Sequence, residues 1–209
     1  MITAGGDDPV VTVVITTYNR PACLREAVKT VSNQDYDPIE LVVVDDCSRE
    51  PAAEVLADLT PDVASFKIRR HEANKGANAA RNTGIESASG SFIAFLDDDD
   101  WWEPEKISKQ VKVFEEAGDG VGLVYTGRKI VEENSVVETA TPGPVEEDMT
   151  KVLLCRNPIG TQSTVMVRSD IARQVPFDEE IPRWADLEWF VGVSTVCDVA
   201  VVQEPLVIY

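Results

Sequence analysis

The amino-acid sequence predicts an α/β fold: a mainly parallel, twisted sheet flanked by helices, with a smaller mixed second half. The main observation is alternation. Over residues 9–120, strand-like and helix-like stretches follow one another as β-α-β-α-β-α-β-α, the pattern of a parallel sheet with helices on both faces. Polar clusters also follow several strand-like runs, and ligands of such sheets bind beyond the carboxyl ends of the strands. A chain of 209 residues that is 44% hydrophobic can bury the core this fold needs.

Four β-branched or apolar runs predict the strands of the first half. The runs PVVTVVIT and IELVVV are rich in valine and isoleucine, which suit a pleated, packed surface. The run FIAFL is apolar apart from one small residue, as expected for a strand buried on both faces. Strands are expected at residues 9–16, 39–44, 64–70 and 92–96.

Helices are expected after each of these strands. The clearest begins at Pro21, which suits a first helical turn, and places Leu24, Val28 and Val31 at helical spacing. The third has a face of small residues, which would let its backbone pack close to a sheet. Helices are expected at residues 21–34, 50–59, 74–89 and from 103–104 to the glycines at 118 and 120.

The second half is less regular. Residues 120–138 predict strand or hairpin structure, and the Pro- and Gly-containing acidic segment 141–148 predicts a surface loop. Beyond the loop, the expected elements are a short helix at 149–155, a strand at 163–167, a helix from 169–170, a helix within 177–194 and a strand at 196–209 that is broken at Pro205. Without a convincing linker, residues 1–209 are expected to form a single domain.

Charge and composition exclude several functions. The chain has 37 Asp plus Glu against 19 Lys plus Arg, a net charge of -18, so nucleic acid is not an expected partner. Such acidity also favours a halophilic source, because salt screens the self-repulsion. A single histidine, His71, excludes histidine-based triads and multi-histidine metal sites. The four cysteines form no zinc pattern and are expected to be reduced.

The sequence contains no apolar run long enough to span a membrane and no signal peptide at MITAGGDDPV. We therefore expect a cytoplasmic protein, which meets the inner face of a membrane only peripherally, through a partner, a lipid-linked substrate or a further segment.

The stretch FIAFLDDDDWW, residues 92–102, is the strongest functional signal. Four carboxylates, Asp97 to Asp100, follow a predicted buried strand. Adjacent carboxylates repel one another, and a divalent cation would turn this repulsion into attraction because hard cations take oxygen ligands. A cation site is expected here, with a solvated acidic loop as the alternative.

Two further polar clusters should reach the same edge of the sheet: Thr17-Tyr18-Asn19-Arg20 and Asp45-Asp46. Neither a P-loop nor a G-x-G-x-x-G turn is present, so a nucleotide would be held through a metal-bridged diphosphate instead. Asp45 could accept hydrogen bonds from a ribose or base, or serve as a turn or capping residue. Tyr18 could stack on a base, or be an ordinary half-exposed tyrosine.

The blocks VVTVVITTYNRP, ELVVVDDCS, NKGANAARNTGI, FIAFLDDDDWWEPEKI, FDEEIPRWADLEWF and EPLVIY, in this order, resemble glycosyltransferase family 2. The resemblance runs from about residue 9 to 209. It implies the GT-A (nucleotide-diphospho-sugar transferase) fold and transfer of a sugar, with inversion, from a nucleotide donor to a glycan, lipid-linked or small-molecule acceptor. It also divides the chain into a nucleotide-sugar-binding half, 9–120, and an acceptor and catalytic-base half, 121–209.

The resemblance assigns roles to individual residues. The family's D-x-D motif falls on Asp97 and Asp99, which implies Mn or Mg as cofactor, with Asp99 as the main metal ligand. Asp97 or Asp98 would serve the ribose or the waters of the ion. The residues implied to line the nucleotide-sugar site are Thr16, Tyr18, Asp45, Lys75, Arg81, Asp97 and Asp98.

The catalytic base is implied to lie in the second half. The family's late acidic pair falls on Ala185 and Asp186, so the first acid is missing. Asp186 occupies the position that usually acts as base, and Glu188 is the alternative. Asp100 is expected to start the following helix, and the tryptophans at 101, 102 and 184 either stack on sugars or pack.

Three other functions stay open at this point. A catalytically degenerate nucleotide-sugar-binding protein is suggested by Ala185. A nucleotidyltransferase would need a glycine-rich basic loop that TTYNRP does not provide. A phospho-receiver-like domain, which is not an enzyme, would explain Asp45-Asp46 but gives the DDDDWW run no role.

Overall fold

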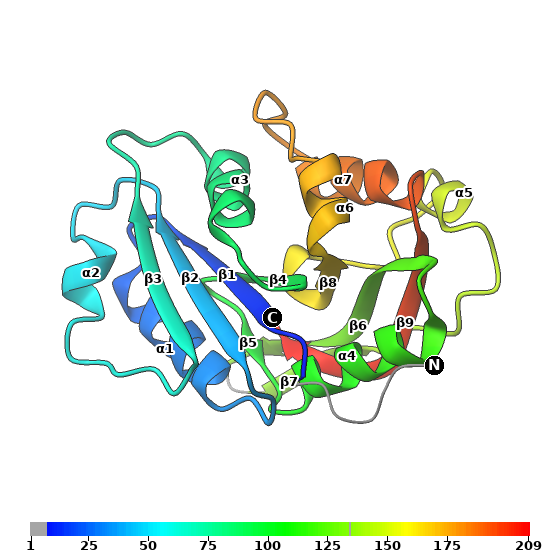
Figure 1. The fold of residues 1–209 in the computed structure, drawn as a ribbon, viewed down its shortest axis with the longest axis horizontal. Helices are drawn as coiled ribbons and strands as arrows, with labels where there is room; N and C mark the ends of the chain where they lie inside the picture. Colours follow the sequence, from blue (N-terminus) through cyan, green and yellow to red (C-terminus); the bar gives the residue numbers. More distant parts are fainter. Residues whose placement is uncertain (1–7, 134) are drawn as a thin grey trace.

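The computed structural model describes residues 8–133 and 135–209, in which nine strands form one sheet (Figure 1). Its first part is parallel, in the spatial order β3-β2-β1-β4. The bounds of these strands are β1 Val11–Thr17, β2 Ile39–Asp45, β3 Ser65–Arg70 and β4 Phe92–Asp97. Four strands therefore occur where the sequence predicts them, each with its bounds within about two residues.

The second part of the sheet mixes directions. The antiparallel strand β8 joins β4 to β6, β6 pairs in parallel with β9, and β9 pairs antiparallel with β5. The strand β7 forms an antiparallel pair with β6, as the hairpin prediction requires. The bounds are β5 Trp101–Trp102, β6 Val121–Glu132, β7 Ser135–Ala140, β8 Val165–Arg168 and β9 Asp198–Ile208.

Helices cover both faces of the sheet and create two hydrophobic cores. One core packs the sheet against α1 Pro21–Ser32, α2 Ala52–Val55 and α4 Lys106–Ala117. The other packs it against α3 Ala77–Ser87, α5 Met149–Leu153, α6 Ser169–Gln174 and α7 Ala185–Ser194. The layered α/β architecture predicted from the alternating pattern is thus confirmed.

The register of the parallel strands sets the position of the polar clusters. Thr16 on β1 lies beside Asp97 on β4, and Thr17 lies beside Asp45 on β2. Parallel strands end at the same edge, so residues that are far apart in sequence converge there.

Several boundaries differ from the sequence prediction. The helix expected over residues 50–59 contracts to α2, and the helix expected from 103–104 begins at Lys106. Asp100 was expected to start that helix, which is wrong: it is 2% exposed and precedes the short strand β5. Burial raises the pKa of Asp100 to about 7, with the neighbouring carboxylates adding to the effect.

The last strand also differs from its prediction. It was expected to break at Pro205, but β9 continues through that residue with shifts in its register against β6. Pro205 has no N–H to donate to a neighbouring strand. It is tolerated because the pairing of β9 with β6 is irregular at this point. The residues Trp101 and Trp102 form a strand that the sequence pattern did not reveal, since two residues are too few for a periodic signal.

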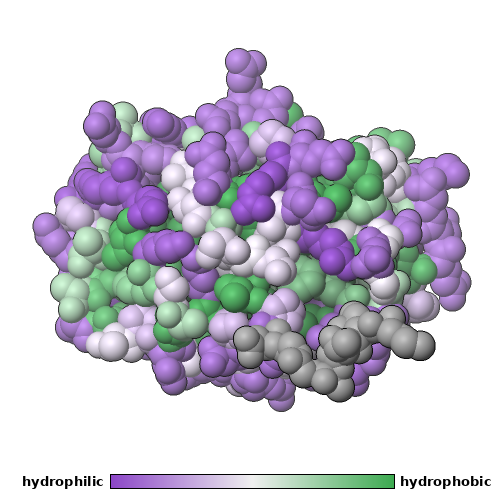
Figure 2. Space-filling view, viewed as in Figure 1, coloured by the Kyte–Doolittle hydropathy of each residue, from purple (hydrophilic) through white to green (hydrophobic). Residues whose placement is uncertain are grey.

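The surface agrees with the acidic composition. Hydrophilic residues cover much of the face shown in Figure 2, with hydrophobic residues visible in patches between them. Within the described residues, no helix is long and apolar enough to cross a membrane.

The close approach of α3 to the sheet depends on Gly84. A Cβ atom at this position would lie 2.3 Å from Cγ1 of Val14 on β1. The small face predicted for this helix therefore has a structural use: it lets the backbone of α3 sit directly on the strand.

We predict that Gly84→Val destabilises the fold by about 2 kcal/mol or more, because overpacking a close contact costs about 1–3 kcal/mol and forces backbone shifts. The measurement is urea unfolding at fixed salt. Gly143→Val is the matched control, since a Cβ at Gly143 would meet nothing within 4 Å. Equal stability of the two variants would contradict the close contact.

Candidate functional site

The converging strand ends line a cavity of about 570 Å³, which we call the acidic cavity. Residues from the ends of β1 and β4 line it together with the start of α3 and the C-terminal Tyr209. Its lining residues are Thr16, Thr17, Tyr18, Arg20, Asp46, Asn74, Gly76, Ala77, Ala80, Arg81, Asp97, Asp98, Asp99 and Tyr209.

The carboxylates of the DDDD run have different surroundings. Asp98 is buried and accepts hydrogen bonds from the hydroxyl of Thr17 at 2.6 Å and from Arg20 at 3.1 Å. Asp99 is half-exposed and bonds Arg20 at 2.5 Å. Burial raises the pKa of Asp98, while Thr17 and Arg20 oppose that shift. Arg20 therefore offsets part of the repulsion within the run, a role that the sequence reasoning did not assign.

Arg81 connects the acidic run to the second half of the chain. Its guanidinium, carried by α3 and 7% exposed, lies 2.8 Å from Oδ1 of Asp97 and 3.4 Å from Oδ1 of Asp186. A buried arginine needs such partners, because an isolated buried charge is very unfavourable. The two carboxylates lie 89 positions apart in the sequence but share one cation in the fold.

Asp186 lies in the first turn of α7 and faces a second cavity of about 530 Å³, the Asp186 cavity. Burial raises the pKa of Asp186, the charge of Arg81 lowers it and the charge of Asp97 raises it. The Asp186 cavity shares Gly76, Ala77 and Arg81 with the acidic cavity, so the two spaces adjoin. Of the two candidate bases, Asp186 lines this cavity. Glu188, two residues later on α7, is exposed and does not appear among the lining residues.

Asp45 does not occupy the position expected of a nucleoside contact. It is completely buried, and its oxygens accept hydrogen bonds from the backbone N–H groups of Ser48 at 2.7 Å and Ala52 at 3.0 Å, and from Arg70. Its carboxylate thus organises the turn from β2 into α2, the turn-and-cap alternative considered for this residue.

Asp46 lines the acidic cavity in its place. Its two oxygens accept 2.8 Å hydrogen bonds from the backbone N–H groups of Lys75 and Gly76, and Oδ1 lies 2.7 Å from Nδ1 of His71. Asp46 therefore shapes the loop before α3. The sequence placed both acids at the strand end; which one faces the cavity depends on the turn geometry.

The remaining candidates are distributed over both cavities. Thr16 and the half-exposed Tyr18 line the acidic cavity, and the exposed Lys75 lines the Asp186 cavity. Trp102 is a packing residue: it is 4% exposed and its indole N–H donates to the carbonyl of Ser163 at 2.9 Å. Trp184 is 79% exposed and lines the Asp186 cavity.

The donor set suits a cation that brings its own phosphate ligands. In the described part of the chain, no group of three acidic, histidine or cysteine side chains is arranged to hold a metal. Mg²⁺ sites, however, commonly use one or two carboxylates together with substrate phosphates. Asp97 and Asp99 line the same cavity, and in the described structure each is hydrogen-bonded through a single oxygen. Both can therefore contribute an oxygen to such a cation.

Residues 12–175 match the family model described as "Glycosyl transferase family 2". Among curated relatives, the GalNAc(5)-diNAcBac-PP-undecaprenol beta-1,3-glucosyltransferase of Campylobacter jejuni is 31% identical over 142 residues, which cover 67% of this chain and 45% of that protein. This chain spans about half the length of the curated relatives it matches.

Two solved structures share the fold. Staphylococcus aureus TarS 1–349 in complex with UDP has a TM-score of 0.79 at 20% identity, covering 95% of this chain and 60% of that one. The mannosyltransferase PcManGT of Pyrobaculum calidifontis, in complex with GDP-Man and Mn²⁺, has a TM-score of 0.74 at 20% identity, covering 97% and 57%. At this identity the likeness establishes the GT-A fold.

We predict that Arg81→Met lowers the free energy of unfolding by about 3 kcal/mol. Removing one partner of a buried ion pair costs about 3–5 kcal/mol, and the partly exposed carboxylates here place the loss at the lower end. Urea unfolding without nucleotide or metal measures it. The matched control is Lys112→Met, whose pair with Glu116 is exposed on both sides and should contribute little. A loss no greater than in the control would show that Arg81 does not hold the two halves together.

Proposed function

The chain belongs to glycosyl transferase family 2, and from this premise we propose that it transfers a sugar from a nucleoside-diphosphate donor to an acceptor hydroxyl, with inversion. The observation that carries the proposal is the Arg81 bridge, because it sets the acids of the donor side, at Asp97, next to the candidate base, Asp186. The family match leaves the nucleotidyltransferase and phospho-receiver alternatives without support.

The donor is proposed to lie in the acidic cavity. Thr16 and Tyr18 offer a hydroxyl and an aromatic ring for the nucleoside, and Asp46, whose oxygens hold the loop before α3, shapes the cavity wall. Arg81 lines this cavity and Lys75 lines the adjoining Asp186 cavity, and both are proposed to border the donor phosphates. TarS and PcManGT, which share the fold, are described with UDP and with GDP-Man, respectively.

Asp99 and Asp97 are proposed to hold a divalent cation, Mn or Mg, with Asp98 assisting at the ribose or at the waters of the ion. A bound cation supplies electrostatic stabilisation of the departing diphosphate. PcManGT is described with Mn²⁺, which supports the choice of metal. Arg20, which already bonds Asp98 and Asp99, orients the two carboxylates.

Asp186 is proposed to take the proton from the attacking acceptor hydroxyl. A base is most effective when its pKa approaches the working pH, and burial shifts the pKa of Asp186 upward. With one base and no second carboxylate acting as nucleophile, a single displacement follows, and this inverts the anomeric centre. Ala185, where the family usually has an acid, favours one rival: a degenerate protein that binds donor without transfer.

The acceptor is proposed to approach from the second half of the chain. The Campylobacter jejuni relative is named for a glycan on undecaprenyl diphosphate. A lipid-linked acceptor would bring this protein to the cytoplasmic face of a membrane, whereas soluble glycans or small molecules would keep it away from the surface.

We predict that Asp99→Asn weakens metal-dependent nucleotide binding by at least about tenfold, because it removes an anionic oxygen ligand from the cation. Calorimetric titration with UDP, GDP and dTDP, each with Mn²⁺, Mg²⁺ or EDTA, measures the effect. Asp119→Asn, an exposed change outside both cavities, is the control. If no nucleotide binds the unchanged protein under any condition, the proposed function is wrong.

We predict that Asp186→Asn slows turnover by about 10²–10⁴-fold, the usual contribution of a general base, and leaves nucleotide binding intact. Turnover is measured as metal-dependent hydrolysis of the nucleotide sugar that binds best. The wild-type rate should fall as the pH drops through the raised pKa of Asp186, because protonation removes the base.

Glu188→Gln is the matched control and should retain the wild-type rate. The reverse result, with loss in Glu188→Gln alone, would move the base to Glu188. Donor binding with no turnover in the wild-type protein, with both acceptor and water available, would favour the degenerate alternative.

A further inference from the structure

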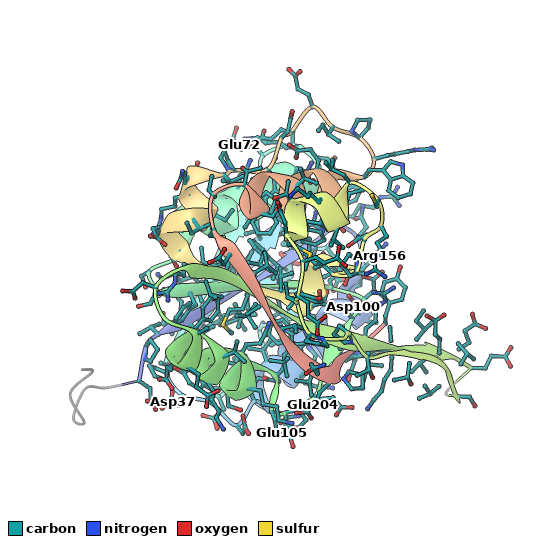
Figure 3. The ribbon with its side chains drawn as sticks, turned by 90° about the vertical axis from the view of Figure 1, so that its right-hand side faces the viewer. Asp37, Glu72, Asp100, Glu105, Arg156 and Glu204 are labelled. Atoms are coloured by element: carbon teal, nitrogen blue, oxygen red, sulfur yellow. The ribbon has the colours of Figure 1, made fainter. Side chains whose placement is uncertain are left out.

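A third cavity, of about 550 Å³, lies in the second half of the chain and contains two arginines. Arg128 reaches it from β6, and Arg156 follows α5; Figure 3 labels Arg156 on the face turned toward the viewer. We propose that this arginine cavity is an acceptor subsite that binds an anionic group, a phosphate or a carboxylate. This inference rests on the proposed transferase function and identifies the chemical class of the acceptor.

The charges of these arginines are uncompensated by ion pairs. In the described residues neither Arg128 nor Arg156 forms a salt bridge, which is also true of other arginines such as Arg69, but these two line one cavity. The guanidinium fork matches carboxylate and phosphate groups in a two-point contact. It is their place in a common cavity that makes these two guanidinium groups available to one incoming anion.

Two acids and a tyrosine line the arginine cavity together with the arginines. Two exposed acids on the 141–148 loop, Glu146 and Glu147, also line it. Tyr125 lines the cavity as a buried residue; burial raises the pKa of its hydroxyl, and the charge of Arg156 opposes that shift. A tyrosine hydroxyl is a hydrogen-bond donor, so Tyr125 can donate to an anion beside Arg156.

The position of Arg128 is built into the backbone. A Cβ atom on Gly160 would lie 1.9 Å from Nη1 of Arg128, and Gly160 has φ +94°, a conformation that favours glycine. The side chain of Asn157 holds this loop, accepting from the N–H groups of Ile159 and Gly160 and donating to the Gly160 carbonyl at 3.0 Å. The guanidinium of Arg128 therefore lies against a turn whose positive φ favours glycine, and a larger residue at position 160 would displace the end of the arginine side chain.

The arginine cavity adjoins the site of transfer. Asn157 lines both this cavity and the Asp186 cavity, which in turn shares Arg81 with the acidic cavity. Nucleotide, base and anion sites therefore follow one another along the molecule. An acceptor held by its anionic group in the third cavity would extend its hydroxyl toward Asp186 in the second, the order that a transfer reaction requires.

The test uses the full chain in EDTA, so that no cation attracts anions to the acidic cavity. Geranyl diphosphate represents a lipid phosphate and glucuronate an acidic sugar, and calorimetric titration measures binding of each. We expect the preferred probe to bind at least about tenfold more weakly to Arg128→Gln and to Arg156→Gln. Gly160→Ala should also weaken binding, although both arginines remain. The matched control is Arg69→Gln, an exposed arginine on β3.

Preference for geranyl diphosphate would support a lipid-linked acceptor, and preference for glucuronate an acidic glycan. Failure of both probes to bind, or binding unchanged by both arginine substitutions, would overturn the proposal. Titration of the same variants with UDP, GDP and dTDP in Mn²⁺ tests the transferase function separately from the anion-binding subsite. Nucleotide binding that survives while anion binding is absent leaves the transferase function in place. Anion binding without nucleotide binding rejects the acceptor role of the cavity.

Discussion

The mutual repulsion of carboxylates is the constraint around which this molecule is arranged. Asp97 to Asp100 stand together at the end of β4, and Asp186 approaches them from α7. Like charges this close destabilise one another unless cations intervene. Arg20 pairs with Asp98 and Asp99, and Arg81 pairs with Asp97 and Asp186. These two arginines make the acidic cavity compatible with a folded chain.

The position of Arg81 depends on packing elsewhere. It is carried by α3, which rests directly on β1 because Gly84 has no side chain to hold the helix away. The loop before α3 is tied to the sheet by Asp46, whose oxygens bond the N–H groups of Lys75 and Gly76. The electrostatics of the site thus depend on a close helix–sheet contact and on an organised loop.

The antiparallel strand β8 joins the two parts of the sheet. The short 3-10 helix Gln162–Thr164 precedes β8 and contacts the acidic run: the hydroxyl of Ser163 accepts a hydrogen bond from the N–H of Asp97 at 3.0 Å. The end of the chain returns as well: β9 pairs with β5, and Tyr209 lines the acidic cavity. The second half of the chain therefore contributes residues to the acidic cavity, which lies mainly at strand ends of the first half.

The sequence by itself determined the α/β class, the four parallel strands and the edge where the site lies, because periodicity and strand-end polarity are local signals. It also singled out the DDDD run, and its resemblance to glycosyltransferase family 2 pointed to Arg81 and Asp186. Tertiary structure alone decided that Asp46 rather than Asp45 faces the cavity, that Asp100 is buried, and that Arg20 and Tyr209 join the site. The reason is physical: which side chain points into a cavity depends on turn geometry and on contacts between residues distant in sequence, and no local pattern records either.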